Sequence, residues 1–192
     1  MRRRHPVSSA FHPAIAEMVR TLALILFFGM VAGRASAQSQ VDEYRLKAAF
    51  LFHFAQFVEW PANGLPSDEM VFCIAGEDPF QGDLEKTVQG KVIGGKSVRV
   101  RHLKQVQDGR GCQLLFIERN ERARDLVVSV KEMPVLTVGE TDDFLRQGGI
   151  IRFSMEERKV RFDVNQEAAE KAHLNVSARL LLLARSVVGR KQ

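Results

Sequence analysis

The stretch that decides the fold lies at residues 70–80 and reads MVFCIAGEDPF. Its first six residues are apolar and rich in strand-forming side chains, and the GEDPF that follows is typical of a turn. A short helix is predicted next, over residues 81–88. Anions often bind where a strand leads into a helix, but Glu77 and Asp78 would repel a phosphate. The segment is therefore predicted to be a structural strand, turn and helix, the repeating unit of α/β proteins.

The same alternation extends to both sides of this unit. Residues 42–60 are predicted to be a helix, because apolar side chains recur at three- and four-residue steps. The further predicted strands are residues 97–103, 114–117, 134–138, 150–155 and 160–164, and the further helices are residues 121–130, 141–147, 165–172 and 177–188. Asn165 is a candidate N-cap. The predicted fold class is α/β, a mostly parallel sheet flanked by helices with one C-terminal antiparallel hairpin.

The N-terminal 37 residues have the three parts of a secretory signal peptide. Four arginines precede the uncharged stretch at residues 21–33, and an Ala-Ser-Ala sequence then precedes a cut after Ala37. A spanning helix needs about 20 apolar residues. The uncharged stretch is too short for that, so we expect cleavage rather than an uncleaved membrane anchor. Either Met1 or Met18 can serve as the start of translation.

The charge of the chain changes once this leader is set aside. The whole chain has 28 basic and 23 acidic residues, a net charge of +5 that hints at nucleic acid or anionic lipid. Residues 1–37 hold five of the basic residues and one of the acidic residues. Residues 38–192, predicted to form one domain, therefore keep 23 basic and 22 acidic residues, a net charge of +1. This balance argues against a nucleic-acid partner.

The chain has two cysteines, Cys73 and Cys112. In an exported protein such an even pair predicts one disulfide. A metal site is the competing interpretation, but neither a CxxC motif nor suitably spaced histidines accompany the pair. A bridge would hold the strand that contains Cys73 close to the strand that begins at Leu114.

No catalytic or metal-binding pattern is found in the sequence. His53, His102 and His173 lie far apart, without HxH or HxxxH spacing, and there is no P-loop, GxGxxG or GxSxG motif. We therefore predict no metal, no cofactor and no enzymatic activity. A binding or regulatory module is the favoured function class.

Aromatic residues gather over residues 50–60 and have two interpretations. Most such stripes are core, but positions 50, 52 and 54 cannot all share one helix face. The surplus apolar surface predicts a protein contact or a small pocket, with Phe52, Phe57 and Trp60 as its candidate residues.

Six segments of the chain are informative when they are taken together and in order. They are residues 44–61, 73–80, 114–117, 135–140, 148–153 continuing to 160–165, and 174–184. Each is weak alone, but together they resemble the YfiR-like family of bacterial periplasmic proteins. An Asn is more usual in that family where His53 stands.

The resemblance implies a function as well as a mixed α/β fold. YfiR-like proteins repress an inner-membrane diguanylate cyclase by binding its periplasmic sensor domain, which lowers cyclic di-GMP and biofilm formation. An outer-membrane lipoprotein of the OmpA-like type can sequester the repressor. By position, Cys73 and Cys112 match the central disulfide of the family. A homodimer is compatible with the sequence, and the alternative function is a small-molecule-binding module that serves another membrane receptor.

The partner-binding surface is predicted on the hairpin and the helix that follows it. The candidate residues are Arg152, Phe153, Phe162, Asn165 and Glu167. In the alternative interpretation Phe153 and Phe162 fill the core, because large apolar side chains are usually buried.

Overall fold

The computed structural model describes residues 40–61, 68–103, 106–119 and 123–189. The predicted signal peptide lies outside these residues. The compact unit considered below begins at Asp42. In the described part of the chain, no helix is both long enough and apolar enough to span a membrane.

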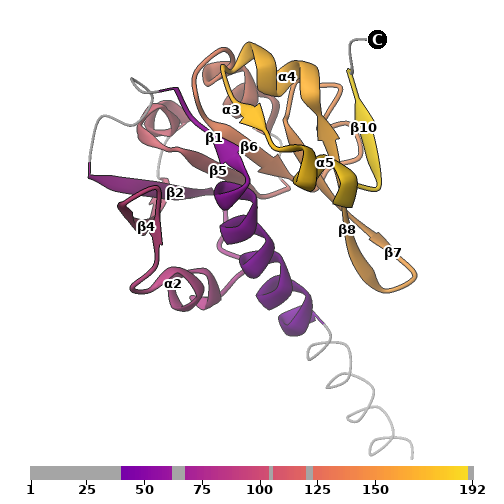
Figure 1. The fold of residues 1–192 in the computed structure, drawn as a ribbon. Helices are drawn as coiled ribbons and strands as arrows, with labels where there is room; N and C mark the ends of the chain where they lie inside the picture. The colour runs from indigo at the N-terminus through magenta and orange to yellow at the C-terminus, as the bar shows by residue number, and fades with distance from the viewer. Residues whose placement is uncertain (1–39, 62–67, 104–105, 120–122, 190–192) are drawn as a thin grey trace, which may run out of the picture. The chain divides into compact units, whose positions relative to one another are not determined.

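A central sheet of eight strands forms the middle of the fold, in the order β10-β8-β7-β6-β5-β2-β4-β3 (Figure 1). The strands are β2 (Glu69–Ala75), β3 (Val92–Ile93), β4 (Lys96–Leu103), β5 (Leu114–Ile117), β6 (Leu136–Gly139), β7 (Ile151–Glu156), β8 (Lys159–Asn165) and β10 (Ser186–Val188). Strands β4, β2, β5, β6 and β7 are parallel to their neighbours in that order. Strand β8 is antiparallel to β7, and β3 is antiparallel to β4. The predicted α/β class with a mostly parallel sheet is confirmed.

Besides the short strand β3, two features of the strands were not predicted. Strand β10 pairs in parallel with β8, so the β7–β8 hairpin is not the edge of the sheet. A separate antiparallel pair joins β1 (Val58–Glu59) to β9 (Asn175–Val176). It ties the end of the first helix to the C-terminal part of the chain.

The first helix covers residues 40–56 of the described chain. The other helices are α2 (Asp83–Val88), α3 (Ala123–Ser129), α4 (Gln166–Lys171), α5 (Ala178–Leu183) and the 3-10 helix η2 (Val106–Gly111). The predicted N-cap of α4 is confirmed, since Asn165 Oδ1 accepts a hydrogen bond from the Ala168 N–H at 3.0 Å. That bond satisfies one of the backbone donors that a helix leaves free at its start.

Three predicted helices differ from the structure. The helix expected to reach Trp60 ends at residue 56, because residues 58 and 59 pair with β9. The helix expected over residues 177–188 ends at Leu183, and residues 186–188 join the sheet instead.

The third, over residues 141–147, consists of turns. The ring of Phe144 lies so close to Gly139 and Gly149 that a Cβ atom there would be 2.4 and 2.2 Å away. The packing of this ring against the two glycines therefore determines the conformation of the segment, which forms turns instead of a helix.

The central strands of the sheet are buried on both faces. Alternate residues of β2 and β5 point to opposite sides. Phe72, Ile74 and Phe116 belong to the larger apolar cluster, which includes the first helix. Cys73 and Leu115 belong to the smaller one, which includes α3 and Phe144. Burial on both faces is usual for parallel strands whose connections are helices.

Candidate functional site

A cavity of about 490 Å³, which we call the carboxyl-edge cavity, lies at the carboxyl ends of the parallel strands. From β2 the chain continues to β4 on one side, and from β5 it continues to β6 on the other, so the strand order reverses between β2 and β5. Open α/β sheets usually bind ligands in the crevice at such a reversal. The carboxyl-edge cavity lies to one side of it, at the ends of β5 and β6 and beside β7. The cavity is lined by the first helix, by the residues after β5 and β6, and by the β7–β8 hairpin.

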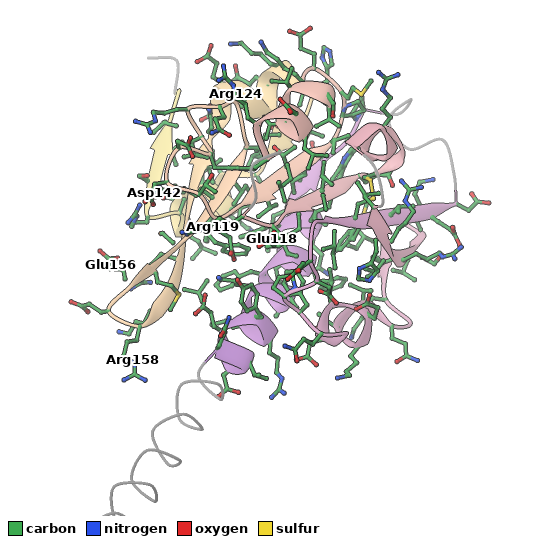
Figure 2. All side chains as sticks on the ribbon, turned by 180° about the vertical axis from the view of Figure 1, so that it is seen from behind. Glu118, Arg119, Arg124, Asp142, Glu156 and Arg158 are labelled. Atoms are coloured by element: carbon green, nitrogen blue, oxygen red, sulfur yellow. A yellow bond between two sulfur atoms is a disulfide. The ribbon has the colours of Figure 1, made fainter. Side chains whose placement is uncertain are left out.

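Charged residues from these elements face the cavity. Figure 2 labels Glu118 and Arg119 after β5, Asp142 after β6, and Glu156 and Arg158 at the far tip of the hairpin. The first three line the cavity, and the two tip residues are not among its walls. The hairpin therefore contributes its base to the cavity and leaves its tip exposed.

A buried ion cluster forms one wall of the cavity. Lys47 is almost fully buried, and its Nζ pairs with Glu43 and, at 2.6 Å, with a carboxylate oxygen of Glu140. The Lys47 ammonium also lies 4.4 Å from the centre of the Tyr44 ring, a cation–π distance. Two carboxylates and one ring face therefore contact the buried Nζ.

Tyr44 completes this cluster as a hydrogen-bond donor. Its hydroxyl donates to Glu140 Oε2 at 3.0 Å. Burial and the adjacent Glu140 carboxylate raise the pKa of Tyr44 well above its ordinary value. The phenol therefore stays protonated, so this wall can bind and orient polar groups but offers no general base at Tyr44.

A second ion cluster fastens the end of the chain to the sheet. Asp163 on β8 is 1% exposed. Arg152 donates to it from Nε and Nη2 at 3.1 and 2.7 Å, and Arg185 does so at 2.9 and 2.6 Å. Ser186 Oγ adds a fifth hydrogen bond at 2.6 Å. Burial alone would raise the pKa of Asp163, but these hydrogen bonds outweigh it and hold the pKa below the ordinary value.

The five predicted partner-binding residues lie in three different parts of the structure. Arg152 and Phe153 line the carboxyl-edge cavity. Asn165 and Glu167 line a second cavity of about 320 Å³, formed with α3 and residues 145–148. Phe162 lies in the core, and Phe153 is buried beside it as its cross-strand partner.

Phe153 and Phe162 are buried, so their side chains do not face solvent as the predicted partner-binding surface would require. Both rings pack with Phe54 of the first helix, at centroid distances of 5.5 and 4.9 Å. The alternative interpretation, in which these two side chains fill the core, describes their position. Glu167 is exposed, whereas Arg152 and Asn165 are partly exposed.

The other candidate pocket residues lie at the end of the first helix. Phe52, Phe57 and Trp60 are each partly buried and pack against the larger apolar cluster. His53, between the aromatic residues, points to solvent and contacts Gln56 at 3.0 Å. Ligand binding at these residues stays a prediction.

A family profile described as YfiR/HmsC-like matches residues 44–185. The chain belongs to the YfiR/HmsC-like family. The resemblance carried by the six sequence segments is confirmed, and the family is one of periplasmic regulators. No curated protein sequence matches the chain.

Two solved structures are similar to part of the chain. A conserved domain protein from Vibrio cholerae has 9% identity and a TM-score of 0.46 over 62% of this chain and 54% of its own. The ABC domain in complex with L-Trp from Streptococcus pneumoniae has 9% identity and a TM-score of 0.45, over 62% of this chain and 55% of its own. The matched part thus spans just over half the length of either protein.

The disulfide of this YfiR/HmsC-like protein joins the two central strands. Cys73 on β2 is bonded to Cys112, two residues before β5, with a Cα–Cα distance of 5.9 Å. Both residues are buried, and the paired register sets Phe72 beside Leu114. The predicted bridge, and the predicted closeness of these two strands, are confirmed.

An exposed apolar surface near the C-terminus was not predicted. Leu182 and Leu183 on α5 are 86% and 69% exposed, and Val188 on β10 is also exposed. We call these three residues the α5–β10 patch. The sequence predicted a longer helix over residues 177–188, but α5 ends at Leu183 and buries only Leu180. Because β10 is the last strand in the order, its outer edge has no strand partner among the described residues.

Proposed function

We propose that this YfiR/HmsC-like protein represses an inner-membrane diguanylate cyclase by binding the cyclase's periplasmic sensor domain. The result is less cyclic di-GMP and less biofilm. The observation that supports this most is the family match, which covers residues 44–185 of a compact unit that begins at Asp42. The family match indicates a periplasmic regulator, and our proposal adds the cyclase as its partner.

We place this activity in the periplasm. Residues 1–37 act as a signal peptide that is cleaved after Ala37, and residues 38–192 are the mature protein. The buried Cys73–Cys112 bridge supports an oxidising compartment, because structural disulfides are rare in the cytosol.

The α5–β10 patch is our candidate for the contact with the cyclase. Leu182 and Leu183 are neighbouring exposed apolar side chains, which can mark a protein-interaction site, and the unpaired edge of β10 can accept a strand from a partner. Glu167, one of the predicted partner-binding residues, adjoins the patch. A Cβ atom on Gly189 would lie 2.6 Å from Glu167 Cβ. The patch therefore combines apolar side chains with a neighbouring carboxylate.

Repression requires only that the protein bind one state of the cyclase more tightly than the other. Complete burial of a leucine side chain contributes about 2 kcal/mol. Two leucines buried only in the off state would therefore supply about 4 kcal/mol, near the roughly 5.5 kcal/mol that reverses a 99:1 equilibrium. An OmpA-like outer-membrane lipoprotein that covered the same patch would release the cyclase.

Deleting the gene should raise cellular cyclic di-GMP and biofilm formation. Re-expression of the wild-type chain should restore the low level, and the Leu182→Asp, Leu183→Asp double variant should not. Val92→Asp is the matched control, because Val92 is also exposed but lies on β3, at the opposite edge of the sheet. Cyclic di-GMP that is unchanged by the deletion would rule out the cyclase as the partner.

A second candidate function is a periplasmic small-molecule-binding module for another membrane receptor. The carboxyl-edge cavity favours it, because about 490 Å³ is within the usual range of ligand sites. A thermal-shift screen should then find a metabolite that raises the melting temperature. Substituting Arg119, which lines the cavity, should reduce that shift. A screen of broad metabolite classes without any shift would contradict this function.

A further inference from the structure

Three side chains that are distant in sequence meet beside β4. Asp78 lies in the turn after β2, Glu85 lies on α2, and His102 lies on β4. One potential ligand atom from each of the three lies within 4.8 Å of the other two. His102 pairs in register with Ile74, four residues before Asp78, so the parallel β2–β4 pair and the intervening helix bring the three together.

We propose that Asp78, Glu85 and His102 bind a zinc ion. The set supplies one imidazole nitrogen and two carboxylate oxygens, a donor combination that zinc accepts. Three protein ligands leave the fourth tetrahedral position to water, as in open zinc sites. The imidazole nitrogen favours zinc over calcium and magnesium, which prefer oxygen ligands.

One carboxylate oxygen of Glu85 has no hydrogen-bond partner among the described residues. Although much of the Glu85 side chain is exposed, its Oε2 is buried and accepts no hydrogen bond among the described residues. Its Oε1 is 2.9 Å from Nε2 of His102. A buried carboxylate oxygen without a donor is costly, and a cation at this position would satisfy it.

Asp78, the third proposed zinc ligand, is held in place by backbone hydrogen bonds. The two carboxylate oxygens of Asp78 accept backbone hydrogen bonds from Phe80 at 2.9 Å and from Gly82 at 3.3 Å. Such bonds fix the direction of a carboxylate and leave further lone pairs for a metal. No sequence pattern indicated this set, because the three positions follow no short spacing and meet only through the sheet.

Among the described residues, two nearby cationic side chains are bound to another carboxylate, that of Asp83. Lys86 and Arg45 both pair with Asp83, at 2.8 and 3.4 Å. Glu85 is not part of these pairs, and its Oε1 contacts Nε2 of His102. A zinc ion here would connect the turn, α2 and β4, and binding to the folded state would stabilise that edge of the sheet.

Calorimetric titration of zinc chloride into the purified chain, without a polyhistidine tag, tests the proposal. We expect one zinc ion per chain, and an affinity at least about tenfold weaker in His102→Ala and in Glu85→Gln, since even indirect metal contacts are worth 10- to 100-fold. His53→Ala is the matched control, because His53 is an exposed histidine outside the cluster and should bind zinc like the wild type.

Circular dichroism first establishes that each variant is folded. Zinc should also raise the melting temperature of the wild type and of His53→Ala, but not that of His102→Ala. The proposal is overturned if the wild type does not bind zinc, or if either His102→Ala or Glu85→Gln binds as tightly as the wild type. Equal competition by calcium chloride would also overturn the assignment to zinc. These outcomes leave the repressor proposal untouched, because it rests on another part of the sheet.

Discussion

Replacing Asp163 by Asn should strongly destabilise the fold. Asp163 is 1% exposed and accepts hydrogen bonds from Arg152, Arg185 and Ser186. The amide removes the negative charge and turns a donor toward two guanidinium groups. Removing one partner from a buried ion cluster costs about 3–5 kcal/mol.

The partial exposure of the arginines sets the expected magnitude. The side chains of Arg152 and Arg185 are 17% and 35% exposed, so water can solvate part of the charge that the variant leaves unpaired. We therefore expect about 3 kcal/mol, at the lower end of the range for broken buried pairs. This corresponds to a more than hundredfold change in the folding equilibrium, by the rule that about 1.4 kcal/mol is tenfold.

Urea unfolding followed by circular dichroism measures this loss. The matched control is Asp142→Asn, which removes a fully exposed carboxylate 3.7 Å from the same Arg152 and should leave the midpoint unchanged. Equal unfolding midpoints for Asp163→Asn and Asp142→Asn would show that the buried cluster does not hold β10 to the sheet.

Acid should reveal the same cluster. The pKa of Asp163 is lowered in the folded state, so its stabilising contribution is present above the unfolded pKa of about 3.9 and is lost as the pH falls through the folded pKa. The wild type should therefore lose stability in this acidic range more steeply than Asp163→Asn. Parallel stability curves below pH 4 would contradict the assignment of this lowered pKa to folding.

Three further substitutions test separate parts of the fold. Replacing Cys73 and Cys112 together by Ala should destabilise the protein by about 4 kcal/mol, the chain-entropy value for their separation of 39 residues, and non-reducing mass mapping should find the bond in the wild type. Asn165→Ala should cost about 2 kcal/mol in urea unfolding, because it removes the cap of α4 and a second hydrogen bond. Gly149→Ala should cost about 2 kcal/mol in the same assay, because its Cβ would collide with the Phe144 ring. A change of less than half of the expected value would contradict the corresponding contact.

Local sequence patterns correctly predicted the features that depend on only a few residues. Strand β5 was predicted with its observed bounds, because a short apolar stretch buried on both faces has few alternatives. The N-cap at Asn165 followed from its own side-chain chemistry. The disulfide followed from an even pair of cysteines and an export signal, without knowledge of the sheet.

Tertiary contacts decided the elements that were predicted wrongly. Residues 186–188 have a helical neighbour in α5, but Val187 pairs with Val164 and Ser186 bonds to Asp163. The length of the β7–β8 turn could have revealed the cross-strand pair of Arg152 and Asp163, because a hairpin register follows from its turn.

The candidate site was the least predictable part of the molecule. Its cavity combines Lys47 from the first helix with Glu140 after β6, and their contact depends on how the helix packs on the sheet. The same holds for Glu85 and His102, which meet only because β2 and β4 are neighbours. The spacing of these residues along the chain does not predict such contacts.

The most direct test of the repressor proposal is cellular cyclic di-GMP in a strain that lacks the gene and re-expresses one of two chains. The full chain should be exported and return cyclic di-GMP to its low level. Residues 38–192, produced without residues 1–37, should stay in the cytoplasm and leave cyclic di-GMP high. Equal repression by both chains, or by neither, would contradict a repressor that acts from the periplasm.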